Sequence, residues 1–106
     1  MHKNEIYTRL ENIIERKRRF NSENFRSEER RQLNAIIKYC LKQLKEEYRN
    51  ILIKSYFECD YAFWWVDYYC KSSYYRKRIK AVTSFVLLFE IIDEDPDYFT
   101  AYRCCL

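Results

Sequence analysis

The sequence predicts an all-α fold, and three observations lead to this prediction. Among 106 residues there is no glycine, and there is a single proline, Pro96. Without glycine, the tight turns that join antiparallel strands are hard to form, which counts against a β fold. The rest of the chain is rich in charged residues and carries apolar residues three and four positions apart, as amphipathic helices do. The length corresponds to one domain, residues 1–106, that is large enough to bury its own core.

The first helix is expected over residues 3–20. Its apolar residues fall on one face at helical spacing, and they are Ile6, Leu10, Ile13 and Ile14. A basic run over residues 16–19 ends this segment. Cations at a helix C-terminus oppose the negative end of the helix dipole. The same run could also contact nucleic acid, and the sequence leaves both interpretations open.

The second predicted helix begins at Ser27, a favourable N-cap, and carries the longest apolar stripe of the chain. The stripe consists of Leu33, Ile36, Ile37, Cys40, Leu41, Leu44, Tyr48, Ile51 and Leu52. Residues 3–58 are therefore expected to form a two-helix antiparallel hairpin. A coiled coil of two chains is the competing interpretation, because the stripe is long and narrow. From Ile51 to Phe57 the apolar residues spread around the helix, which indicates deeper burial or a new packing unit.

An aromatic segment follows the second helix. Asp60 is a suitable cap for a short third helix that holds Phe63, Trp64, Trp65 and Val66. Large aromatic residues usually lie in a core, so this segment is expected to fill the core of the second half. Stacking on the bases of a single-stranded nucleic acid is the alternative use of such residues.

The fourth helix is expected over residues 72–92. One face collects its apolar residues, namely Tyr75, Ile79, Val82, Val86 and Phe89. The opposite face collects Ser73, Arg76, Lys77, Lys80 and Ser84. Residues 61–89 carry five basic residues and one acidic residue, whereas residues 90–106 carry one basic and five acidic residues. This uneven distribution of charge suggests an anionic partner.

The basic face of the fourth helix is suited to a DNA groove. Small polar and long cationic side chains near the helix N-terminus reach base edges and phosphates, while the far side packs on the fold. The candidate nucleic-acid-binding residues are Lys71, Ser72, Ser73, Arg76, Lys77, Arg78 and Lys80. Arg78 lies at the border of this face and is expected to reach a phosphate. The alternative is an ordinary solvated face of a bundle helix.

The stretch from Tyr69 to Ala81, followed by Phe85, resembles the recognition helix of sigma-factor region 4-type helix-turn-helix domains. It is most similar to those of small phage late-gene regulators, which often read Ser-x-Ser-Thr-Tyr-Tyr-Arg followed by basic residues. Residues 73–76 match the Thr-Tyr-Tyr-Arg part, and Cys70 stands at the capping serine. The resemblance implies a helix-turn-helix-like unit over residues 61–92, with residues 61–69 as its first helix. The glycine-free, lysine-rich style also resembles small proteins of AT-rich Mollicutes genomes.

The sequence offers little for catalysis, cofactors or metals. The one histidine is His2, and no nucleophile–histidine arrangement or CxxC pair is present. We therefore expect a protein that is not an enzyme and that holds no cofactor and no metal. Five cysteines without a signal peptide favour a reducing, cytoplasmic location. The longest apolar run is far too short to cross a bilayer, so no membrane contact is expected.

The leading hypothesis is thus a small transcriptional regulator that binds double-stranded DNA. Residues 3–58 would pair with a second copy or contact RNA polymerase. The alternative is a helical-bundle interaction protein, similar in size and charge to bacteriocin immunity proteins, with no nucleic-acid role. Single-stranded nucleic-acid binding through the aromatic segment is a third class. The acidic tail, residues 93–106, is expected to end the fourth helix before Pro96 and could fold back to screen the basic face.

Overall fold

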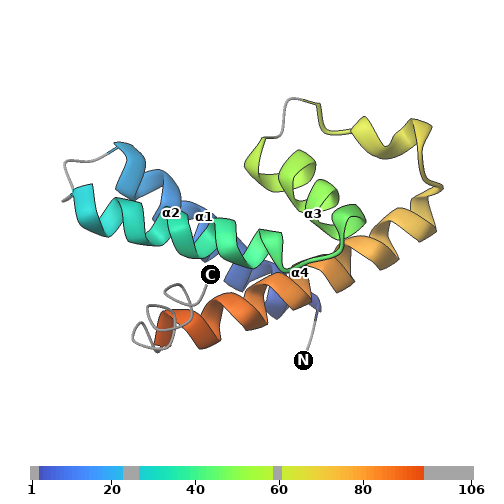
Figure 1. Cartoon of the computed structure of the whole chain (residues 1–106). Helices are drawn as coiled ribbons and strands as arrows, with labels where there is room; N and C mark the ends of the chain where they lie inside the picture. Colours follow the sequence, from blue (N-terminus) through green and yellow to red (C-terminus); the bar gives the residue numbers. More distant parts are fainter. Residues whose placement is uncertain (1–2, 23–26, 59–60, 95–106) are drawn as a thin grey trace.

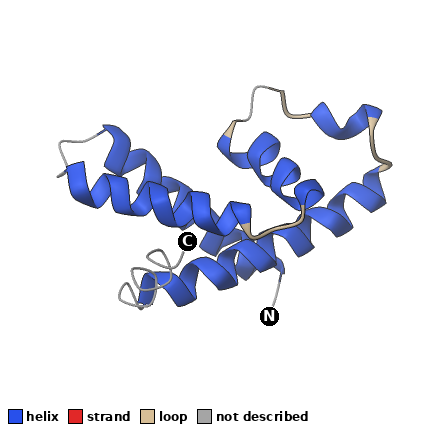
Figure 2. Cartoon of the chain, viewed as in Figure 1, coloured by secondary structure: helices blue, strands red, loops and turns tan. Residues whose placement is uncertain are grey.

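The computed structural model describes residues 3–22, 27–58 and 61–94, and in these ranges it confirms an all-α fold. Figure 2 shows only helices and loops in the described ranges. The elements are the α-helices α1 (Lys3–Ser22), α2 (Ser27–Lys42), α3 (Glu46–Leu52) and α4 (Lys71–Glu94), the π-helix η1 (Ile53–Phe57) and the 3-10 helix η2 (Trp64–Asp67).

The longest helix, α4, organises the molecule. It contacts each of the other three α-helices. In Figure 1, α1 and α2 lie over the C-terminal half of α4, while α3 and the short elements that follow it lie over the N-terminal half. The N-terminal half of α4 therefore has one side against the fold and one side toward solvent.

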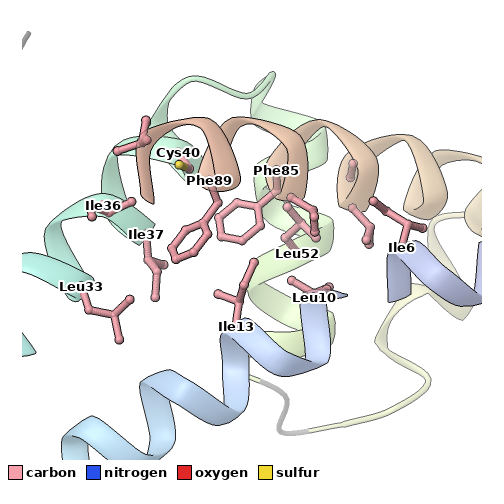
Figure 3. Close-up of a cluster of buried hydrophobic side chains, with 14 residues drawn as sticks. Ile6, Leu10, Ile13, Leu33, Ile36, Ile37, Cys40, Leu52, Phe85 and Phe89 are labelled. Carbon is pink, nitrogen blue, oxygen red and sulfur yellow. The ribbon is translucent and has the colours of Figure 1, made fainter. Parts of the chain in front are cut away.

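The core lies where α1 and α2 meet α4 (Figure 3). It contains Ile6, Leu10 and Ile13 of α1, Leu33, Ile36, Ile37 and Cys40 of α2, Leu52 of α3, and Ala81, Val82, Phe85, Val86, Phe89 and Ile92 of α4. The stripe predicted for the first helix is thus confirmed, and so is the part of the second stripe that lies on α2. Cys40 is fully buried, and burial raises the pKa of its thiol to about 12, as expected for a small buried residue.

The prediction of one continuous second helix is wrong. The chain leaves the helix after Lys42 and starts α3 at Glu46, with Lys45 in an extended conformation (φ −55°, ψ 147°). The guanidinium of Arg49 donates hydrogen bonds to the carbonyl oxygens of Leu41 (3.1 Å), Lys42 (3.3 Å) and Leu44 (3.1 Å). Leu41 and Lys42 belong to the last turn of α2, whose carbonyl groups lack the usual helical donors, and Leu44 lies in the connection to α3. Arg49 gives all three carbonyl groups a donor and thereby stabilises the break.

The end of α3 packs into the interior of the protein. Ile51 and Leu52 are completely buried, as the broadening of the stripe indicated. Glu58 N–H donates to the Ile53 carbonyl at 2.6 Å, which closes the wider π turn of η1. Phe57 then packs edge-on against Phe85, with 5.7 Å between ring centroids. This contact attaches η1 to the middle of α4.

Two ion pairs join α1 to the C-terminal part of α4. Arg9 donates hydrogen bonds to both carboxylate oxygens of Glu90, and Arg16 contacts both carboxylate oxygens of Asp93 at 3.0 Å. The helix ends at Glu94, close to the predicted end. Residues 95–106 lie outside the described part, and so does the predicted screening of the basic face by this tail. No helix in the described ranges is long and apolar enough to span a membrane.

Candidate nucleic-acid interface

Helix α4 begins directly after Cys70. The carbonyl oxygen of Cys70 accepts a hydrogen bond from Tyr74 N–H at 2.9 Å. The Cys70 sulfur accepts from the backbone N–H of Ser73 and contacts the Ser72 hydroxyl, and both interactions lower the pKa of this exposed thiol. Cys70 therefore occupies the N-cap position, where the sequence resemblance placed a capping serine.

Four of the seven candidate residues lie on the solvent side of α4. They are Lys71, Ser72, Arg76 and Lys80, while Ser73 is half-buried. The buried side is centred on Tyr74, which is 2 % exposed, and not on Tyr75, which is 39 % exposed. The predicted apolar face included Tyr75, whereas the structure buries its neighbour Tyr74 instead. Arg76 and Lys80 are one turn apart and face away from the fold together.

Lys77 does not belong to the open basic face. Its ammonium lies 2.6 Å from Glu47 Oε1 on α3, and the same oxygen accepts a hydrogen bond from the Tyr69 hydroxyl at 3.0 Å. The hydrogen bond to Glu47 raises the pKa of Lys77, and the hydrogen bond from Lys77 lowers the pKa of Glu47. The ammonium also lies 5.2 Å from the Tyr69 ring centroid. The charge of Lys77 is thus compensated inside the protein.

Arg78 is turned toward the fold and is not placed to reach a phosphate in this conformation. Its guanidinium carbon lies 4.6 Å from the ring centroid of Tyr75 and 5.0 Å from that of Tyr7. Its Nε also donates a long hydrogen bond, 3.4 Å, to the Tyr7 hydroxyl. Arg78 therefore stacks between aromatic rings of α1 and α4 and connects these helices.

A shallow groove of about 340 Å³ extends the open face of α4, and sequence reasoning did not assign it. Its lining consists of Tyr48, Ile79, Lys80, Thr83 and Ser84. The ammonium of Lys45 lies 5.7 Å from the Tyr48 ring centroid at the start of α3. The groove thus combines one ammonium group, two hydroxyl side chains and one aromatic ring, with Lys45 beside that ring. The contribution of Tyr48 was missed because it comes from a different helix, α3, and Lys45 directly precedes that helix.

The segment predicted as the first helix of a helix-turn-helix differs from the prediction. Only the four residues of η2 form a helical turn between Tyr61 and Tyr69, and it is a 3-10 turn. Trp65 stacks on Tyr74 with 4.5 Å between ring centroids and 6° between planes. Trp64 Nε1 donates to the Ser55 hydroxyl at 3.1 Å, and that hydroxyl shares a 2.7 Å hydrogen bond with the Tyr74 hydroxyl. These side-chain contacts fix η2 to both α4 and η1.

The outer side of this segment forms an exposed aromatic surface. It consists of Tyr61, Phe63, Val66 and Tyr68, which are 63 %, 59 %, 55 % and 72 % exposed. The prediction that the aromatic segment fills the core is thus wrong, because only the two tryptophans are partly covered. Clustered exposed apolar side chains of this kind mark interaction surfaces in many proteins.

Within the described ranges, no three histidine, cysteine, aspartate or glutamate side chains gather as a metal site would require. Comparison with known protein families, curated proteins and solved structures finds no match for this chain.

Proposed function

We propose that this protein is a small, non-catalytic, cytoplasmic regulator that binds double-stranded DNA through the open face of α4. The observation that carries the proposal is the exposure of Ser72, Arg76 and Lys80, which follow one another four residues apart on one face of α4. Lys71, also exposed, lies beside Ser72 at the N-terminus of the helix. Cations and hydroxyl groups in such a row contact successive phosphates and base edges.

Two further features support the proposal. The groove beside Lys80 adds the hydroxyl groups of Thr83 and Ser84 to the face, and hydroxyl side chains are common phosphate ligands. The N-terminus of α4 carries the positive end of the helix dipole, which favours a nearby phosphate. The resemblance to sigma-factor region 4-type proteins supports the proposal through α4 alone, since a 3-10 turn stands where the first helix of the unit was predicted. Contact of residues 3–58 with RNA polymerase or a second copy remains part of the proposal.

The test is duplex DNA binding over a series of salt concentrations. The key variant is Arg76→Ala/Lys80→Ala, and Lys38→Ala/Lys42→Ala on the exposed side of α2 is the matched control with the same loss of charge. Each lost phosphate contact reduces the slope of log binding constant against log salt concentration by about 0.9 in magnitude. The slope of the α4 variant should therefore be smaller than that of wild type by about 1.8. The control should keep the wild-type slope.

Two results would refute the proposal. One is the absence of duplex binding at low salt. The other is an equal loss in both variants, which would mean that only total charge matters. A competition between duplex and single-stranded DNA, run on the same samples, separates groove binding from base stacking.

A second candidate function is a helical-bundle interaction protein without a nucleic-acid role. The exposed aromatic surface favours it, because tyrosine and phenylalanine are enriched in protein interfaces. This candidate predicts no salt-dependent DNA binding by the folded wild-type protein.

A further inference from the structure

A pocket of about 340 Å³ opens between the end of η1 and η2, beside the exposed aromatic surface. Its lining consists of Lys54, Glu58, Tyr61, Trp64, Asp67 and Tyr68. None of these residues belongs to α4. The pocket is therefore separate from the face to which we assign DNA, and it lies within the size range of small ligand sites.

The aromatic walls of the pocket already hold a cation. The ammonium of Lys54 lies 5.2 Å from the ring centroid of Trp64 and 5.8 Å from that of Tyr68. The negative face of an aromatic ring attracts a cation at such distances, and tryptophan does so most strongly. The protein's own lysine thus shows which charge these two rings accept.

The charges of the lining also favour a cation. The lining contains two acidic side chains, Glu58 and Asp67, and one basic side chain, Lys54, so acidic groups outnumber basic ones. A phosphate would meet these carboxylates, whereas an incoming guanidinium would meet two acids and two ring faces. Lys54 is solvent-exposed and can move out toward water when another cation enters.

The rim of the pocket fits a protein partner. Tyr61 and Tyr68 belong both to the lining and to the exposed aromatic surface, and Phe63 and Val66 continue that surface. An arginine flanked by apolar residues would place its charge in the pocket and its neighbours on the rim. Arginine and aromatic residues are the side chains that most often anchor protein interfaces.

We infer that this pocket is a recognition site for a cationic side chain of a protein partner. An arginine or lysine of the partner enters the pocket and takes the place that Lys54 now occupies. The occupant is a short apolar segment with a central arginine. Lys54 acts as a competitor that the partner displaces, so its removal strengthens binding.

The probe for the test is the blocked tripeptide acetyl-Leu-Arg-Leu-amide, added to the full chain and followed by the indole N–H signals of Trp64 and Trp65 in NMR spectra. The matched control peptide replaces arginine with citrulline, which has the same shape and no charge. We expect a saturable shift of the Trp64 signal with the arginine peptide alone. Trp65, which stacks on Tyr74, should shift little.

Three variants localise the effect. Lys54→Ala should tighten binding of the arginine peptide by about threefold or more, as expected for removal of one competing cation–π contact. Lys45→Ala, which removes a cation over the single ring of Tyr48, should leave the affinity unchanged. Tyr68→Ala should weaken binding, and its side chain is exposed enough for the fold to remain intact.

Several outcomes would overturn the inference. Equal shifts with the citrulline peptide would show that charge is not recognised. Unchanged or weaker binding by Lys54→Ala would show that the lysine does not occupy the same place. A shift of Trp64 with oligothymidylate and none with the arginine peptide would assign the pocket to nucleic acid. None of these results would alter the salt-dependence test of α4.

Discussion

Arg76 and Lys77 are neighbours in the chain, yet their charges serve different purposes. Arg76 faces solvent, whereas Lys77 is paired with Glu47, thirty residues earlier in the sequence. Helical periodicity places a side chain on one side of a helix, but it does not reveal what another helix presents to that side. For this reason the sequence predicted the exposure of Lys71, Ser72, Arg76 and Lys80 and missed the inward contacts of Lys77 and Arg78.

The Glu47–Lys77 pair makes stability depend on pH in a defined window. Folding lowers the pKa of Glu47 from 4.5 and raises that of Lys77 from 10.5. The stabilisation is therefore present between these values and is lost as pH falls through the lowered pKa of Glu47. Glu47→Gln should be less stable than wild type at neutral pH, and the difference should vanish in acid.

Urea unfolding at a series of pH values measures this difference. Glu46→Gln, at the adjacent exposed position, is the matched control and should follow wild type throughout. A difference between Glu47→Gln and wild type that stays constant down to strongly acidic pH would contradict the assignment.

At the level of elements, the sequence located the helices well and their interruptions poorly. The stripes of α1 and α2 follow helical spacing and were predicted correctly. No glycine or proline marks the break after Lys42. The break is instead stabilised by hydrogen bonds from Arg49, seven residues downstream, so the local sequence does not reveal it. The segment of η2 was wrongly predicted as a longer helix for a similar reason. Its Trp65 stacks on Tyr74, which belongs to the next helix.

Arg49 should therefore be a sensitive position. Arg49→Ala removes hydrogen bonds to three carbonyl groups and should lower the free energy of unfolding by about 1–2 kcal/mol. Arg49→Lys keeps the charge but lacks the planar fork, so it should recover only a small part of the loss. Chemical denaturation measures both effects. Full recovery by lysine would mean that charge alone stabilises the end of α2.

For the whole molecule, the absence of glycine and the apolar spacing were enough to predict an all-α fold, but they did not predict that α4 would contact each of the other α-helices. The aromatic residues were the exception. Their size predicted burial, but the core is already filled by aliphatic residues of α1 and α2 and by phenylalanines of α4, so most of the aromatic segment lies outside. Competition for core space depends on the complete fold and is not visible in a local stretch of sequence.

Phe85 is the clearest test of this core. It is fully buried and contacts Phe57 and Phe89, whose ring centroids lie 5.7 and 6.1 Å away. Phe85→Ala should lower the free energy of unfolding by about 3–5 kcal/mol, a large part of the stability of a domain this size. Leu87→Ala, on the same helix but 41 % exposed, should change it by less than about 1 kcal/mol. Similar losses in both variants would place the core elsewhere.

The position of α4 in the chain has a consequence for how the protein is made. A ribosome synthesises α1, α2 and α3 before it reaches the phenylalanines of α4, on which all three of them pack. Until then, the apolar stripes of α1 and α2 can cover each other only in part, because both also pack on α4. The nascent chain therefore carries exposed apolar residues through most of its synthesis, and cooperative folding must wait for the last described helix. A chaperone that binds such stripes would meet this protein early and release it only when α4 has emerged.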